Sequence, residues 1–306
     1  MIALALTMVL AAAPCTEAKA EGCSAKCDSG DAKACETLGK ALVNGTGGVA
    51  RDAVASQAAY VKGCDAGSGR SCNVASANLL AGNTLPKDDA TGVALMEKAC
   101  TLKHLPACTY FASFYDDGKY GVKKDPAKAA VLRTTACDAG GPEACFQLGQ
   151  IYDEGVGVEV DKAKAHALYM KACGLKWGGG CFSAGIDFRD GEGTKADPKA
   201  MLKSLEQACT LDFNPSCSML AGMYSEGTSG VKKDAKKAFN FAKTACERVT
   251  FPTAFEACPI AAQWARDGEG TKLDLKVAKR LADHGCINKN QESCDLAGVL
   301  EMLLTK

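Results

Sequence analysis

Apolar residues recur with helical spacing inside a unit that repeats every 36 or 37 residues over most of the chain. Counted from the cysteine that opens each unit, position three is apolar, position four is small and position seven is mostly large. Spacings of three, four and seven lie on one face of a helix. The opening cysteines are Cys35, Cys72, Cys108, Cys145, Cys181, Cys217 and Cys258. The pattern predicts a first helix whose small residue lets a neighbouring helix come close.

Glycine and aspartate punctuate every unit at fixed distances. A glycine stands ten residues after each opening cysteine, and an aspartate follows six or seven residues later. The glycines are Gly45, Gly82, Gly118, Gly155, Gly191, Gly227 and Gly268, and the aspartates are Asp52, Asp88, Asp125, Asp161, Asp197, Asp234 and Asp274. Glycine tolerates the left-handed conformation that ends a helix, and aspartate caps a helix N-terminus. Each unit is therefore predicted to be a helical hairpin that closes on a cysteine twelve residues after the aspartate.

A hairpin of this kind buries its apolar face only by stacking on its neighbours. We predict an all-α protein, a right-handed α/α solenoid superhelix of about seven hairpins. One solenoid domain would cover residues 21–306, with a lone second helix at residues 21–34 as its N-terminal cap and a C-terminal cap at residues 294–306. The frame breaks once, at residues 248–255, where four extra residues carry Phe251 and Phe255. This insertion is either a ligand-contacting loop or a longer turn that buries two aromatic rings, and we favour the turn.

Sixteen of the eighteen cysteines form pairs at the junctions between units, and seven residues separate most pairs. Zinc ligands are usually two to four residues apart and often include histidine, of which the chain has three. Disulfides that tie one hairpin to the next fit better, and no metal or other cofactor is expected. The predicted pairs are Cys27–Cys35, Cys64–Cys72, Cys100–Cys108, Cys137–Cys145, Cys173–Cys181, Cys209–Cys217, Cys246–Cys258 and Cys286–Cys294.

Disulfides indicate an oxidising compartment, and the N-terminus agrees with one. The apolar run Met1–Ala13 is too short to span a bilayer, and Ala18-Lys19-Ala20 has the small-x-small form of a signal-peptidase site. We predict a signal peptide at residues 1–20 and a secreted or periplasmic protein with no transmembrane segment.

An alternative reading of the N-terminus concerns Cys15. The stretch Ala12-Ala13-Pro14-Cys15 weakly resembles a lipobox, which would make the protein an outer-membrane lipoprotein with a lipid anchor at Cys15. Cleavage after Ala20 would instead leave Cys23 outside the eight predicted pairs. Cys23 is then a free thiol, an intermolecular link or an alternative partner for Cys35.

Charge and motifs exclude several functions. Lys plus Arg and Asp plus Glu number 36 each, which gives no electrostatic reason to expect nucleic acid. Paired glycines such as Gly155 and Gly157 recur as turns and are not a nucleotide loop. The one Ser-x-x-Lys match, Ser229 to Lys232, lies in a glycine-to-aspartate loop and is read as accidental. His104, His166 and His284 occupy unrelated positions in their units, so no catalytic residue is predicted.

A ligand-binding surface is predicted from helical phase. First helices line the concave face of an α-solenoid, and positions one, five and eight should face its groove. In the fourth and fifth units these positions hold Phe146, Gln150, Asp153, Phe182, Ile186 and Arg189. The more polar flanking positions are Thr109, Ser113, Asp116, Ser218, Gly222 and Ser225. The alternative is that Phe146 and Phe182 only pack against adjacent second helices.

The Leu-Gly, Tyr, Gly-x-Gly-Val, Asp-x-x-Lys-Ala and Lys-Ala-Cys pattern between Cys145 and Cys173 resembles the Sel1-like repeat, a relative of the tetratricopeptide repeat. The cysteines eight apart are further similar to those of the Helicobacter cysteine-rich proteins. The resemblance implies a non-enzymatic scaffold that binds a protein, a peptide or a cell-envelope component. It also implies an alternative, a β-lactam-binding protein with weak β-lactamase activity.

Overall fold

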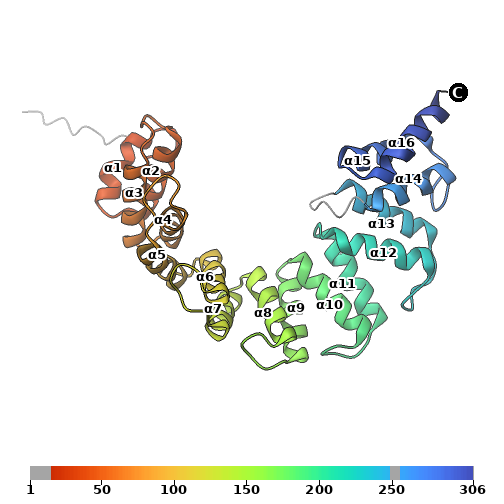
Figure 1. The fold of residues 1–306 in the computed structure, drawn as a ribbon, viewed down its shortest axis with the longest axis horizontal. Coiled ribbons are helices and arrows are strands. Elements are labelled where there is room, and N and C mark those ends of the chain that lie inside the picture. The colour runs from red at the N-terminus through yellow and green to blue at the C-terminus, as the bar shows by residue number, and fades with distance from the viewer. Residues whose placement is uncertain (1–14, 249–255, 306) are drawn as a thin grey trace, which may run out of the picture. The chain divides into compact units, whose positions relative to one another are not determined.

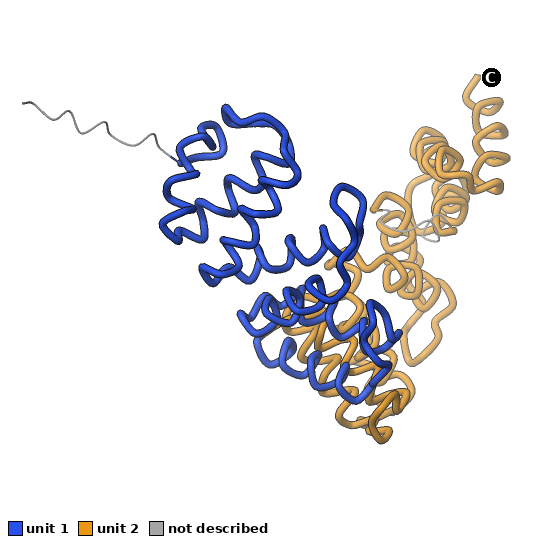
Figure 2. The backbone as a smooth tube through the Cα atoms, turned by 60° about the vertical axis from the view of Figure 1, so that its left-hand side comes forward, with its two compact units in different colours: residues 1–139 blue, residues 140–306 orange. Residues whose placement is uncertain are grey.

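The structure, a computed structural model, describes residues 15–248 and 256–305. Its regular elements are helices, and one isolated β-bridge joins Thr16 to Lys19. The helices fall into two compact units, Met1–Ala139 and Gly140–Lys306 (Figure 2). The predicted insertion at residues 248–255, with Phe251 and Phe255, lies outside the described residues apart from Arg248.

The first unit holds three hairpins behind a short N-terminal helix (Figure 1). A 3-10 turn, Ala20–Cys23, leads into α1 (Ser24–Asp28). The hairpins are α2 (Ala32–Asn44) with α3 (Ala53–Asp65), α4 (Gly69–Ala81) with α5 (Asp89–Thr101), and α6 (Leu105–Asp117) with α7 (Pro126–Asp138).

The second unit holds four hairpins and a closing helix (Figure 1). The hairpins are α8 (Pro142–Glu154) with α9 (Lys162–Gly174), α10 (Gly178–Asp190) with α11 (Pro198–Thr210), α12 (Asn214–Glu226) with α13 (Ala235–Glu247), and α14 (Ala257–Asp267) with α15 (Leu275–Ile287). The closing helix is α16 (Gln291–Leu304). Each helix packs on the next along the chain within its unit, so the predicted all-α solenoid of seven disulfide-bonded hairpins is confirmed.

Glycine and aspartate end and begin the helices as the sequence predicts. All seven glycines at position ten are C-caps in the left-handed conformation, for example Gly155 with φ of 75°. All seven aspartates accept a hydrogen bond from a backbone N–H in the first turn of the second helix, as Asp161 does from Lys164. These caps satisfy backbone groups that the helix itself leaves unpaired.

The small residue at position four sets how closely the two helices of a hairpin approach. A methyl group added to Gly149 would lie 2.5 Å from the ring of Tyr169, and one added to Gly39 would lie 2.9 Å from Tyr60. At Gly185 the obstacle is Leu205, again at 2.9 Å. In all three hairpins the opposing residue stands eight positions after the capping aspartate. The bulky side chain of the second helix therefore occupies the space that the glycine leaves.

Disulfides join consecutive hairpins where their helices are closest. In seven of the eight predicted bonds, the Cα–Cα distance is 4.4 to 4.9 Å. Cys137 and Cys145, which were predicted to pair, are each disulfide-bonded. Small residues stand just before these cysteines. A methyl group on Gly180 would lie 2.6 Å from Cβ of Ala172.

The N-terminal cap differs from the prediction. Residues 21–34 are not one helix, because α1 ends at Asp28 and the chain turns at Gly30, where φ is 91°. Ala32 already begins α2, whose N-cap is Asp31. The turn has the form found after Cys64, Cys100 and Cys137, where a closing cysteine in the last turn of a helix is followed by a residue with positive φ. Cys27 is such a closing cysteine.

Cys23, which the sequence left without an assigned partner, is bonded to Cys15 with a Cα–Cα distance of 4.5 Å. Backbone N–H groups of Ala20 and Glu21 both donate to the carbonyl of Gly47, at 2.7 and 3.2 Å. Ala20 is fully buried. The same sulfur of Cys15 cannot carry a lipid thioether and this disulfide, and the residues around Ala20 are part of the folded cap.

We expect Gly149→Ala to lower the free energy of unfolding by about 1–3 kcal/mol, because its methyl group overlaps the Tyr169 ring. Gly298→Ala in α16 is the control, since nothing lies within 4 Å of its added methyl group. The control should be neutral or stabilising by up to about 1 kcal/mol. Urea unfolding followed by circular dichroism measures both. Equal effects of the two substitutions would contradict the close approach at position four.

We expect the mature, oxidised protein to begin before Cys15 and to have no thiol that iodoacetamide alkylates without prior reduction. Peptide mapping should recover Cys15 linked to Cys23. A chain that begins at Glu21 with an alkylated Cys23 would contradict the observed cap. Cys23→Ser is the control, because it should expose one thiol, that of Cys15.

Candidate functional site

The predicted groove residues lie on two first helices of the second unit. Phe146, Gln150 and Asp153 are on α8, and Phe182, Ile186 and Arg189 are on α10. Gln150 and Arg189 are exposed, and the other four are half-buried. Nothing in the structure tests whether they bind a ligand, so this assignment stays a prediction.

Both phenylalanines make aromatic contacts inside the fold. Phe146 lies 5.8 Å, centroid to centroid, from Tyr169 of α9. Phe182 lies 5.2 Å from Phe213, which precedes α12. These contacts cover part of each ring, as the packing alternative expects, and the rest of each side chain is exposed to solvent.

The charged groove residues are paired with neighbours and not with one another. Asp153 accepts from Lys162 at 2.7 Å. The guanidinium of Arg189 donates twice to the adjacent Asp190, both times at 2.8 Å. A ligand that used Asp153 or Arg189 would therefore compete with an existing ion pair.

A mainly apolar cavity lies one repeat further on, between α12, α13 and α14. Its volume is about 280 Å³. Positions one, five and eight of α12 line it, namely Ser218, Gly222 and Ser225, which the helical phase had marked as flanking groove positions. Its other lining residues are Ala221, Glu226, Ala242, Glu256, Ala257, Ile260 and Trp264.

Sequence reasoning missed the α14 wall of this cavity. Ile260 and Trp264 stand at positions two and six after Cys258, not at the expected one, five and eight. Ile260 is 44% exposed, and Trp264 is half-buried. A signal was present, because Trp264 is one of two tryptophans in a chain with 6% aromatic residues. We call this the α12–α14 cavity.

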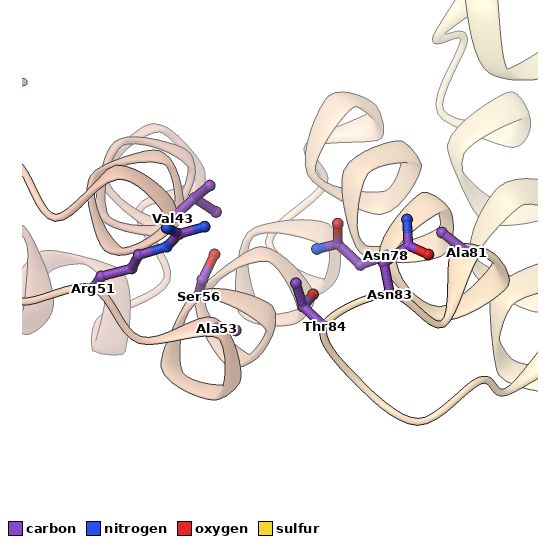
Figure 3. A pocket seen from close by; sticks show the side chains of 8 residues that line it. All are labelled: Val43, Arg51, Ala53, Ser56, Asn78, Ala81, Asn83 and Thr84. Carbon is purple, nitrogen blue, oxygen red and sulfur yellow. The ribbon is translucent and has the colours of Figure 1, made fainter.

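A second, more polar cavity lies in the first unit, with a volume of about 230 Å³. Figure 3 shows the guanidinium of Arg51, the hydroxyl groups of Ser56 and Thr84, and the amide of Asn78 around it. The Asn78 amide donates to Gln57 at 3.0 Å, and the Ser56 hydroxyl donates to the carbonyl of Gly39 at 2.8 Å. Two of its polar groups are thus engaged within the protein.

The Ser-x-x-Lys match has no catalytic surroundings that the structure describes. Ser229 lies in the exposed loop between α12 and α13 with φ of 52°, and Lys232 is exposed beside it. No hydrogen bond reaches the Ser229 hydroxyl within the described ranges, and no group of three His, Cys, Asp or Glu residues there could hold a metal ion. None of the described helices has the length and apolar character needed to cross a bilayer.

His166 links the fourth and fifth hairpins. Its Nδ1 lies 2.9 Å from a carboxylate oxygen of Asp187, and its ring meets Phe188 edge-on at 4.8 Å. Burial raises the pKa of Asp187 above its ordinary value, and the hydrogen bond with His166 opposes this. The pair joins α9 to α10, so His166 has a structural role in the contact between two successive hairpins.

This architecture of stacked, capped helix pairs defines the class of α/α solenoid repeat proteins. Within that class, the chain contains Sel1 repeats. The Sel1 repeat model matches residues 72–104, 106–141, 142–176 and 214–248. The structure adds hairpins that this model does not match, such as α10 with α11.

A solved structure supports the fold. The chain is similar to a Sel1 repeat protein from Oxalobacter formigenes, with 21% identity over 92% of this chain and 80% of that one, and a TM-score of 0.76. It is also similar to the Helicobacter pylori cysteine rich protein B, with 29% identity over 45% of this chain and 99% of that one, and a TM-score of 0.35. No curated protein sequence matches the chain significantly.

His104 yields a prediction about pH. It is the N-cap residue of α6 but makes no side-chain cap hydrogen bond. Burial, followed by the nearby charge of Arg70, lowers the pKa of His104 below 6.5. The folded state therefore binds this proton less readily than the unfolded state, and stability is lost as the pH falls below 6.5.

We expect His104→Asn to stabilise the protein by about 1 kcal/mol through a new cap, and by more at about pH 5 than at about pH 7.5. Thermal unfolding at the two pH values measures this. His284→Asn is the control for loss of a histidine. A gain that is the same at both pH values would contradict the burial of His104.

Proposed function

We propose that this protein is a non-enzymatic scaffold of the secreted or periplasmic space that binds a protein, a peptide or a cell-envelope component. The observation that carries the proposal is the α12–α14 cavity, which presents Ile260 and Trp264 on the first-helix face of a rigid, disulfide-bonded repeat array. Apolar pockets with an aromatic wall are typical anchor sites of protein interfaces. The Sel1-repeat fold is consistent with a protein-interaction role.

The surroundings of the cavity support recognition over catalysis. Its polar lining consists of two serine hydroxyl groups and two carboxylates, and these are joined to no histidine or lysine among the described residues. Phe146 and Phe182 would extend the same binding surface along α8 and α10. The compartment rests on the disulfides, since bonds of this number persist in an oxidising environment.

The test uses the purified, oxidised protein with an envelope extract, cross-linking and mass spectrometry. We expect Ile260→Ser to weaken the captured partner's affinity about 5- to 30-fold, because it removes an apolar anchor worth about 1–2 kcal/mol. Ile287→Ser is the matched control, since Ile287 is 80% exposed on a second helix of the same unit. Equal capture by the wild type and Ile260→Ser would contradict a role for the cavity.

The same preparation should not turn over a chromogenic β-lactam. Turnover that survives repurification and disappears in Ser229→Ala would overturn the scaffold proposal in favour of a hydrolase.

A further inference from the structure

We propose that the α12–α14 cavity receives a lysine or arginine side chain of the partner. This inference rests on the proposed function, because it names the chemistry of the group that the scaffold holds. Three features of the cavity support it: an apolar interior, an aromatic wall and uncompensated negative charge at the mouth.

The interior suits the aliphatic stem of a long basic side chain. Ala221, Ala242 and Ala257 are buried and small, so they form a smooth apolar floor. Ile260 and Trp264 form one wall. Lysine and arginine bury their methylene groups against such surfaces while keeping the charged end near solvent.

The mouth carries two carboxylates without partners. Glu226 is the last residue of α12, and Glu256 directly precedes α14. Both are exposed, and within residues 15–248 and 256–305 neither forms an ion pair or hydrogen bond. Two basic residues on the neighbouring elements are already paired, Lys243 of α13 with Glu247 at 3.8 Å and Arg266 of α14 with Asp267 at 2.7 Å. The mouth is therefore negative overall.

Two further groups favour a cation there. The C-terminal end of α12 lies at Glu226, and the C-terminal end of a helix dipole carries partial negative charge. The Trp264 ring attracts a cation placed over its face. An acidic ligand side chain would meet repulsion from both carboxylates, and a neutral aliphatic one would leave them unused.

The test is a nuclear magnetic resonance titration with three peptides, acetyl-Ala-Arg-Ala-amide, acetyl-Ala-norleucine-Ala-amide and acetyl-Ala-Glu-Ala-amide. The chain's two tryptophans, Trp177 and Trp264, provide the indole N–H signals. We expect the arginine peptide to shift the Trp264 signal and leave the Trp177 signal as an internal reference. The arginine peptide should bind more tightly than the other two.

Glu226→Gln and Glu256→Gln keep the shape of the mouth and remove its charge. Each should weaken the arginine peptide about 2- to 5-fold, as expected for an exposed ion pair. Binding of the norleucine peptide should not change. Glu159→Gln, an exposed loop glutamate of the same unit, is the matched control and should change neither.

An arginine peptide that leaves the Trp264 signal in place, or binds no better than the norleucine or glutamate peptide, would overturn the inference. So would unchanged affinity in both Gln variants. If partner capture depends on Ile260 while the arginine peptide fails, the scaffold stands and only the basic preference is wrong. If the arginine peptide binds as expected but Ile260→Ser captures the partner as well as the wild type does, the preference of the cavity for a basic side chain stands and the proposed scaffold surface is wrong.

Discussion

The helices of a hairpin touch where the fourth residue after the opening cysteine meets the eighth residue after the capping aspartate. Gly149 and Tyr169, Gly39 and Tyr60, and Gly185 and Leu205 are the tightest cases. The large side chain on one helix fills the space beside the glycine on the other helix. This contact sets how closely the two helices of the hairpin approach. The disulfide geometry and the stacking of successive hairpins depend on this spacing, because both require the helix ends to stay in register.

A second pair of positions varies in concert from one hairpin to the next. Where position seven of the first helix is tyrosine, the third residue after the capping aspartate is lysine: Tyr115 with Lys128, Tyr152 with Lys164 and Tyr224 with Lys237. Lys164 lies 3.9 Å from the Tyr152 ring centroid and donates to its hydroxyl at 2.7 Å. The hairpins that have Leu42, Leu79, Phe188 or Ala265 instead carry Ala55, Thr91, Ala200 or Val277. The lysine therefore occurs in the hairpins whose first helix offers it a tyrosine ring.

Most of the frame was predictable because it depends on local chemistry. Gly155 as a left-handed C-cap and Asp161 as an N-cap follow from backbone preferences that need no tertiary information. The N-terminal cap was missed although Cys15 and Cys23 have the same spacing of eight as most other pairs, because assigning cleavage after Ala20 removed Cys15 from consideration. The α12–α14 cavity was predicted on its α12 side only. The cavity exists because the small residues Ala221, Gly222 and Ala242 leave space beside Trp264. These four residues lie on three different helices, so the pattern of a single helix does not predict the cavity.

The disulfides pair cysteines that follow one another in the chain, from Cys15 with Cys23 to Cys286 with Cys294. No described bond encloses another cysteine pair or crosses one. A chain that enters an oxidising compartment N-terminus first therefore presents each cysteine just before its native partner. Oxidation in order of arrival produces the native bonds directly, with no reshuffling step. Each hairpin junction can be closed before the repeats that follow it enter that compartment.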